Sequence, residues 1–156
     1  MGTITYHRVS ADDCEILAET RISMTIELTG DQPQEIKDKL KLQLVAYFKK
    51  ATEDNTCISY LAKVNGEIAG IGSVHLREMP GNFYNLSGKW AYVMSMFTHP
   101  AFRRKGICTG ILKALMEDAR KEGFNAFELH ASTEGKFVYE QNGFQEHKQP
   151  TFRRYF

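Results

Sequence analysis

The sequence predicts one α/β domain, spanning residues 1–156, in which a mixed sheet carries helices on both faces. A strand–helix–strand crossover over Trp90–Ala131 makes two neighbouring strands parallel. Two alternating apolar runs joined at Asn65-Gly66 form an antiparallel hairpin, and two stretches of helical periodicity precede them. A chain of this length fits a single layered domain that buries roughly 70% of its unfolded surface.

The first third of the chain is predicted to form one strand and two helices. Thr3–Val9 alternates imperfectly, as a short strand does. Ser10 opens an S-x-x-D arrangement that caps the free N–H groups of a helix reaching about Leu28. The turn at Thr29–Pro33 ends this helix, and a second amphipathic helix covers about Gln34–Lys50.

The middle of the chain contains the hairpin and the predicted central strand. Cys57–Val64 and Glu67–Arg77 are the two strands of the hairpin. Met79–Lys89 is rich in Gly, Asn and Ser, which predicts a long exposed loop. Trp90–Thr98 is almost continuously apolar and is therefore placed in the middle of the sheet.

The last third alternates helices and strands. A helix over Gly106–Glu122 ends at Gly123, and Asn125–Ala131 is the next strand. Glu134–Asn142 is a short helix, and Phe144–Phe156 supplies one or two final strands. The predicted order is therefore β-α-α-β-β-β-α-β-α-β-(β).

Composition excludes several classes of function. The net charge of +1 gives no global field for nucleic acid or an anionic membrane. No apolar run approaches the ~20 residues of a membrane span, and the N-terminus lacks the apolar core of a signal peptide. Three cysteines without metal-ligand spacing favour reduced thiols in a cytoplasm and no metal site.

The stretch Tyr92–Leu112 carries the clearest functional signal. It reads as a buried strand that passes through a basic, glycine-bearing turn into the start of a helix. A helix start presents free backbone N–H groups and the positive end of the dipole, and both favour phosphate. Arg103, Arg104 and Lys105 lie just before it. We therefore expect a phosphate-bearing ligand at this turn.

Two motifs in this context resemble one family. A strand followed by His99-Pro100 and Arg103-x-x-Gly106-x-Cys108 resembles the acyl-CoA-binding motif of the GCN5-related N-acetyltransferases (GNAT). The segment Phe137–Phe144 is similar to a second motif of the same family, and the predicted element order fits its fold. Cys108 departs from the pattern, which has Gly or Ala there, but a thiol is little larger than a methyl group.

The resemblance implies acetyl-CoA as cosubstrate. The family binds the pyrophosphate on backbone N–H groups of the turn and pairs the pantetheine arm with the strand before it, where a bulge splays two strands. Carried over to this sequence, it implies cofactor-binding positions at Met96, Phe97, Thr98, Arg103, Arg104, Lys105, Gly106, Ile107, Cys108 and Thr109.

The resemblance also implies catalytic roles. Tyr139 stands where many members place the tyrosine that protonates the leaving CoA sulfur; the alternative is an ordinary core aromatic. Tyr92 stands where histone-type members carry a glutamate base, so that base is missing. Cys108 either has a lowered pKa beside the cations or simply replaces a small residue. Other candidate bases left open are Ser95, Tyr92 itself, Glu27, His75 and Glu128.

The function predicted from the sequence is acetyl transfer from acetyl-CoA to a primary amine of a small molecule, peptide or protein. The alternative is a non-catalytic acyl-CoA sensor or interaction module, which the missing glutamate favours and Tyr139 disfavours. A P-loop nucleotide site is excluded because Gly-x-x-x-x-Gly-Lys-Ser/Thr is absent. We expect the acceptor pocket to involve the first two helices and the Met79–Lys89 loop, and the resemblance is compatible with a homodimer.

Overall fold

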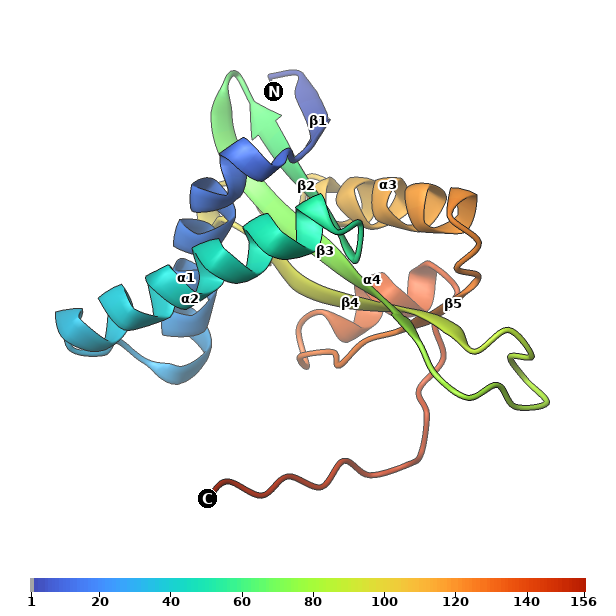
Figure 1. The fold of residues 1–156 in the computed structure, drawn as a ribbon. Coiled ribbons are helices and arrows are strands. Elements are labelled where there is room, and N and C mark those ends of the chain that lie inside the picture. The colour runs from blue at the N-terminus through green and yellow to red at the C-terminus, as the bar shows by residue number, and fades with distance from the viewer. Residues whose placement is uncertain (1) are drawn as a thin grey trace.

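A computed structural model of the chain describes residues 2–156. Its centre is a five-stranded mixed sheet of order β1-β2-β3-β4-β5 (Figure 1). Neighbouring strands are antiparallel from β1 to β4, whereas β4 and β5 are parallel because a helix crosses over between them. The strands span Ile4–Arg8 (β1), Cys57–Val64 (β2), Glu67–Glu78 (β3), Lys89–Thr98 (β4) and Ala126–Glu128 (β5).

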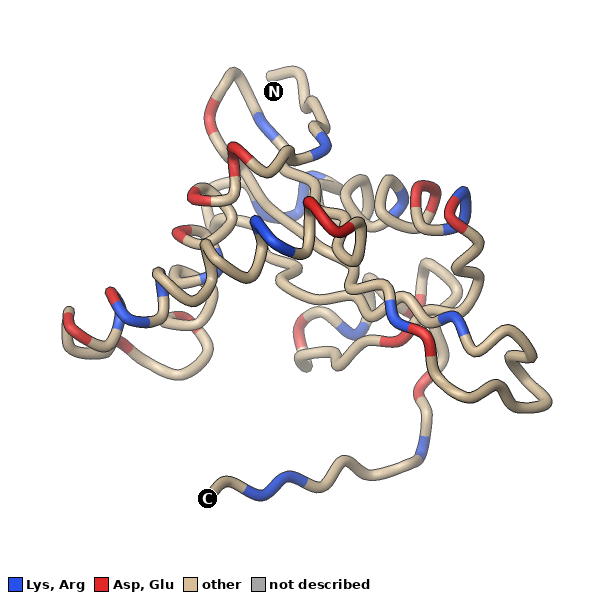
Figure 2. Tube along the Cα trace, in the orientation of Figure 1, with Lys and Arg blue, Asp and Glu red and all other residues tan. Residues whose placement is uncertain are grey.

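Helices cover both faces of the sheet, as the sequence predicts (Figure 1). Two long helices, α1 (Cys14–Thr29) and α2 (Gln34–Glu53), pack on one face, and α3 (Ile107–Lys121) packs on the other. A short helix α4 (Lys136–Gln141) follows β5, and single 3-10 turns lie at Ala11–Asp13 (η1) and Pro100–Phe102 (η2). Charged residues of both signs are interspersed along α2 and α3 (Figure 2). None of the helices in residues 2–156 is long and apolar enough to cross a bilayer.

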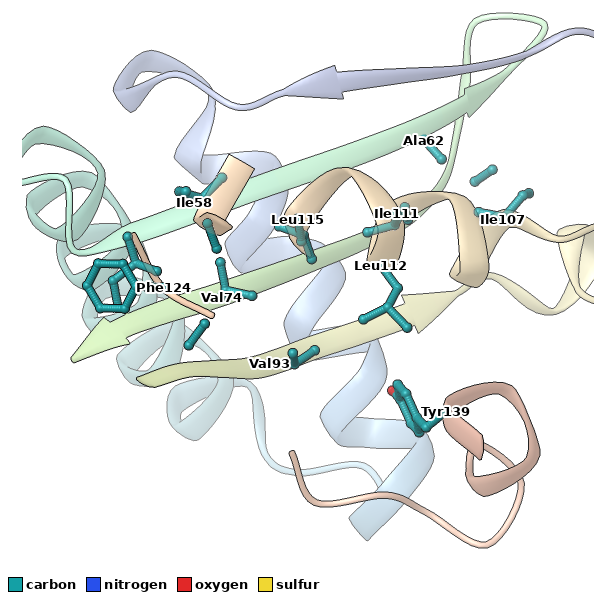
Figure 3. Packing of buried hydrophobic residues seen from close by; sticks show 14 of the residues in the cluster. Ile58, Ala62, Val74, Val93, Ile107, Ile111, Leu112, Leu115, Phe124 and Tyr139 are labelled. Carbon is teal, nitrogen blue, oxygen red and sulfur yellow. The ribbon is translucent and has the colours of Figure 1, made fainter. Parts of the chain in front are cut away.

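The sheet separates two apolar cores. On the α3 face, Ile111, Leu112 and Leu115 are fully buried against Val74 and Val93 (Figure 3). On the other face, completely buried side chains of α1, α2 and β3 meet, and these include Leu17, Phe48 and Ile71. Burying such side chains is worth about 1.5–3 kcal/mol each. The two cores pack against opposite faces of β4, and β4 carries the candidate site described below.

A charged cluster fixes α3 to the sheet edge. Tyr60 in β2 donates a 2.6 Å hydrogen bond to Asp118 in α3, and Arg8 in β1 donates to the same oxygen at 3.1 Å. Burial alone would raise the pKa of Asp118, but the Tyr60 hydrogen bond and the charges of Arg8 and Lys121 hold it below its usual value. The ionised carboxylate is therefore the form that the fold stabilises.

Three predicted details of the elements are wrong. No strand forms over 144–156: the chain leaves α4 in extended form, and residues 145–156 are all exposed (Figure 1). Residues 145–149 are all polar, so a strand there would have no apolar face to bury against the core. Pro150 lacks the backbone N–H that pairing with a neighbouring strand requires. Ser10 makes no side-chain cap, because its hydroxyl donates to the Asp13 carboxylate. Strand β5 has three residues and not the seven of 125–131.

The predicted loop between β3 and β4 is confirmed, and it has a defined shape. The Met79 N–H donates to Gly88 O at 2.8 Å, which closes the base of the loop. Within it, Asn82 Oδ1 accepts from the backbone N–H groups of Tyr84 and Asn85, both at 2.9 Å. Such Asx turns set the path of a loop without burying it.

Candidate active site

The central strand β4 contains a bulge. Its pairing with β3 shifts register between Ile71, which faces Phe97, and Ser73, which faces Met94, so β4 has one extra residue there. Ser95 absorbs it with a left-handed backbone (φ 56°). Gly72 lies opposite, and a Cβ there would overlap the side chains of Met96 and Ile111. The absence of a side chain at Gly72 therefore lets Met96 lie against β3 at the bulge.

Beyond the bulge, one edge of β4 is open. β5 pairs only with Trp90, Ala91 and Tyr92. The His99 N–H donates to Ala69 O on the β3 side at 2.9 Å. Because successive residues of a strand point their backbone groups to alternate sides, the N–H groups of Met96 and Thr98 point away from β3, toward the edge without a strand. This edge offers backbone donors and acceptors to an extended ligand.

The turn after β4 forms a cradle of backbone N–H groups. Arg104 and Gly106 adopt left-handed conformations, with φ of 61° and 77°, and α3 begins at the next residue. Among residues 2–156, no backbone acceptor receives a bond from any of the six N–H groups of 104–109. Consecutive free N–H groups form an anion-binding concavity when left-handed residues alternate with other backbone conformations and a helix begins directly afterwards.

The cradle fits a pyrophosphate. Among residues 2–156, apart from the neighbours of Gly106 in the chain, no atom lies within 4 Å of the place where a Gly106 Cβ would stand, so the turn is open to solvent on that side. Arg104 and Lys105 are exposed beside it. The residues present therefore fit the CoA group that the sequence predicts, and the roles of individual side chains there stay predictions.

Arg103 has partners within the protein. Its Nη2 donates to both oxygens of Glu27 at 2.6 and 2.8 Å, and its Nε donates to Thr98 O at 2.9 Å. The guanidinium also lies 5.7 Å from the centre of the Phe97 ring. Arg103 thus ties the last turn of α1 to the end of β4, a connection that the motif alone does not reveal.

Tyr139 reaches from α4 toward the C-terminal half of β4 and the start of α3 (Figure 3). The residue is 9% exposed, yet its hydroxyl makes no hydrogen bond within residues 2–156 and is not among the fully buried polar atoms. The group is therefore available to a ligand. Burial, and to a lesser extent the nearby Cys108, raises the pKa of Tyr139, so the phenol stays protonated at neutral pH.

Cys108 does not have the lowered pKa that one interpretation of the sequence allowed. Its side chain packs into the first turn of α3, and burial raises the pKa of its thiol. A protonated, partly buried thiol is a poor nucleophile. The structure thus favours the other interpretation, in which Cys108 replaces a small residue.

The sheet face on the α1 and α2 side carries a row of polar and aromatic residues beside the bulge. Cross-strand pairing places His75, Tyr92 and Glu128 side by side on β3, β4 and β5. Tyr47 from α2 approaches the row with its hydroxyl 3.4 Å from His75 Nδ1. Arg77 lies 5.3 Å from the centre of the Tyr92 ring. This row therefore lies close to the bulge, on the sheet face that α1 and α2 cover.

The structure brings some candidate bases together and engages both carboxylates. Glu128 pairs with Arg77 at 2.9 Å, and Glu27 pairs with Arg103 outside the row. Ser95 is buried at the bulge and accepts a 2.6 Å hydrogen bond from Arg21. Both carboxylates are therefore ion-paired in this arrangement.

Two further histidines pack against aromatic rings. The ring centres of His130 and Tyr92 lie 5.8 Å apart in a T-shaped arrangement, and those of His99 and Phe97 lie 5.1 Å apart in the same arrangement. His99 precedes η2 without capping it through its side chain. Among residues 2–156, no group of three or more His, Cys, Asp or Glu side chains is placed to hold a metal ion.

Sequence reasoning missed three residues of this region, Arg21, Tyr47 and Arg77. Arg21 and Tyr47 lie in predicted helices, and Arg77 ends a predicted strand. The only signal in the sequence is that Arg77 lies two residues after His75 in one predicted strand, so both side chains are expected on the same face of the sheet. The helical residues converge on the bulge through tertiary packing, which no local pattern encodes.

Comparisons with known proteins define the class to which this fold and site belong. The acetyltransferase (GNAT) family matches residues 22–144, and the chain belongs to that family. No curated protein matches it in sequence.

Solved structures agree with this assignment. A predicted acetyltransferase from Clostridium acetobutylicum, crystallised with acetyl-CoA, is 25% identical with a TM-score of 0.84, covering 97% of this chain and 96% of that chain. A GCN5-related N-acetyltransferase from Ralstonia eutropha JMP134 is 15% identical with a TM-score of 0.84, covering 97% and 99%. A glucosamine-6-phosphate N-acetyltransferase from Arabidopsis thaliana is 20% identical with a TM-score of 0.69, covering 99% of both chains. The last two share the fold.

Proposed function

We propose that this protein transfers the acetyl group of acetyl-CoA directly to a primary amine of a small molecule, peptide or protein. One observation carries the proposal: the free N–H groups of residues 104–109 follow directly after the part of β4 whose outer edge has no neighbouring strand. A pyrophosphate and an extended, amide-bearing arm need these two features in this order. Acetyl-CoA in the related structure from Clostridium acetobutylicum supports the choice of cosubstrate.

The proposed binding mode follows from the backbone. The pyrophosphate lies on the N–H groups from Arg104 to Thr109, and the pantetheine arm pairs with Met96–Thr98 as a further strand would. Arg104 and Lys105 add positive charge at the phosphates. Arg103 acts indirectly, because its bonds to Glu27 and Thr98 O hold the turn in place.

The proposed chemistry is a direct substitution at the thioester. The neutral amine attacks the carbonyl carbon, a C–N bond forms, the C–S bond breaks, and the proton that the amine loses passes to solvent water, from which Tyr139 regains its own proton after each turnover. The Met96 N–H beside the bulge polarises the carbonyl oxygen. Tyr139, protonated at neutral pH, gives its proton to the departing sulfur.

The acceptor must be neutral to react. Deprotonating an amine of pKa ~10.4 at pH 7 costs roughly 4–5 kcal/mol. Holding the two reactants together can supply a contribution of that size or more. Because Glu27 and Glu128 are both ion-paired, we assign neither as the base that deprotonates the amine. We therefore expect kcat/KM to rise with pH as the neutral fraction of the acceptor amine increases toward its pKa.

The test is CoA release from acetyl-CoA in the presence of a panel of primary amines, with the acetylated product identified by mass. Time-dependent release that needs an amine supports the proposal. Binding of acetyl-CoA without transfer to any amine would instead favour an acyl-CoA sensor. This is the second candidate function because Glu27 and Glu128, the two carboxylates considered as bases, are both ion-paired.

A further inference from the structure

Arg21 is a cation beside the bulge, and within residues 2–156 it has no anionic partner. It lies in α1, is partly buried, and its Nη1 donates to Ser95 Oγ at 2.6 Å. Among residues 2–156, no carboxylate oxygen lies within the 4.0 Å of an ion pair with it. A partly buried guanidinium loses hydration and gains no opposite charge in return, which is unfavourable unless a ligand supplies that charge.

The acidic residues of α1 are all engaged elsewhere. Glu15 and Glu19 both pair with Lys41 of α2 at 3.0 Å, and Glu27 pairs with Arg103. These pairs keep the carboxylates on the outer side and the far end of the helix. Arg21 is thus left as the charged group of α1 that faces β4.

Two further hydrogen-bonding groups gather near Arg21. Burial raises the pKa of Tyr47, and the Arg21 charge opposes this shift, so the phenol and the guanidinium share one neighbourhood. Tyr47 in turn lies within 3.4 Å of His75 Nδ1. Donors from α1, α2 and β3 therefore converge beside the bulge, on the face expected to receive the acceptor.

We propose that Arg21 binds an oxyanion group, a carboxylate or a phosphate ester, on the acceptor amine. The inference rests on the acetyl-transfer function proposed above and names the class of its substrate. Ser95 directly precedes Met96, so the guanidinium lies within about 7 Å of the Met96 N–H, because one residue step of about 3.8 Å plus one hydrogen bond is the upper limit of that distance. The acceptor therefore carries its anionic group within a few bonds of the reacting amine.

A purely structural role for Arg21 predicts a different result. If Arg21 only holds Ser95 in its left-handed conformation, removing either partner weakens turnover equally with every acceptor. If Arg21 binds the acceptor, removing its charge changes the preference between acceptors. Ser95→Ala removes the hydrogen bond and keeps the charge, so it is the matched control for Arg21→Gln.

The experiment compares acceptors that differ only in the anionic group, at saturating acetyl-CoA. One set pairs amino acids with their amides, and the other pairs phosphoethanolamine with ethanolamine, which separates carboxylate from phosphate recognition. We expect the wild-type protein to favour the anionic member of at least one pair by tenfold or more in kcat/KM. Arg21→Gln abolishes this preference, whereas Ser95→Ala retains it while lowering kcat for both members.

Equal or better turnover of the neutral members by the wild-type protein would overturn the inference and leave acetyl transfer intact. A preference that survives Arg21→Gln would overturn it as well. If no acceptor is acetylated, the acetyl-transfer proposal fails separately, and calorimetric titration of the same pairs into CoA-saturated protein decides the inference. Binding of the anionic member that Arg21→Gln removes supports it, and absence of such binding refutes it.

Discussion

Replacing Tyr139 with phenylalanine isolates one hydroxyl group. The phenol makes no hydrogen bond within residues 2–156, so the substitution leaves no partner unsatisfied, and we expect less than about 0.5 kcal/mol of change in the free energy of unfolding. The ring keeps its edge contact with Phe144, whose centre lies 6.0 Å away. The core of the α3 face is thus preserved.

The effect on catalysis is larger. General acids contribute about 10²–10⁴-fold, and a thiol of pKa ~8.5 is already a good leaving group, so the lower end applies. We expect kcat to fall about 10–100-fold, or roughly 1.4–2.8 kcal/mol in activation free energy. Because burial raises the pKa of Tyr139, its acid form persists as pH rises, and wild-type turnover should not fall through ionisation of Tyr139 up to about pH 10.

Steady-state kinetics of CoA release and calorimetric acetyl-CoA binding together test this reasoning. The expected pattern is a lowered kcat with an unchanged dissociation constant for acetyl-CoA. An unchanged kcat in Tyr139→Phe would remove the hydroxyl from the mechanism and return the residue to ordinary packing.

Three further outcomes can be measured. Asp118→Asn should destabilise the protein by about 1.5–3 kcal/mol in denaturant titrations at pH 7. The pKa of Asp118 is lower in the folded protein than in the unfolded chain, so its contribution to the free energy of unfolding is complete above the unfolded value near 3.9. That contribution is lost as pH falls through the folded pKa, and Asp118→Asn should lack this acid-dependent loss of stability. Gly72→Val should cost about 1–3 kcal/mol in stability and weaken acetyl-CoA binding, and full affinity would contradict the proposed role of the bulge. Burial raises the pKa of all three thiols, to about 11 at Cys57, so a thiol reagent at pH 8 should label native protein slowly and unfolded protein quickly at Cys14, Cys57 and Cys108.

Local sequence signals predicted most of the fold. Asn65 and Gly66 both adopt positive φ, 50° and 82°, which is the turn that Asn-Gly favours between antiparallel strands. Gly106 and Gly123, also at positive φ, flank α3 as expected of residues without a Cβ. These features depend on only a few neighbouring residues, so the local sequence is sufficient to predict them.

The incorrect or missing details depend on contacts distant in sequence. The left-handed backbone of Ser95 has no local signature, since serine rarely adopts it, and the tie to Arg21 joins residues far apart in the chain. The binding of Arg103 by Glu27 likewise needs the end of α1 to lie beside the turn. The turn with free N–H groups is mostly backbone and was predictable, whereas the row of His75, Tyr92 and Glu128 with Tyr47 and Arg77 beside it is assembled from side chains of several elements and was not.

Calorimetric titration of acetyl-CoA into the wild-type protein, Gly106→Ala and Gly106→Glu tests the central claim most directly. Both variants carry the same left-handed strain, about 1–2 kcal/mol, but only glutamate places bulk and negative charge in the cradle. We expect one site per chain in the wild-type protein, modestly weaker binding in Gly106→Ala, and none in a folded Gly106→Glu. Absence of binding to the wild-type protein, or equal affinity in Gly106→Glu, would contradict a CoA pyrophosphate site at this turn.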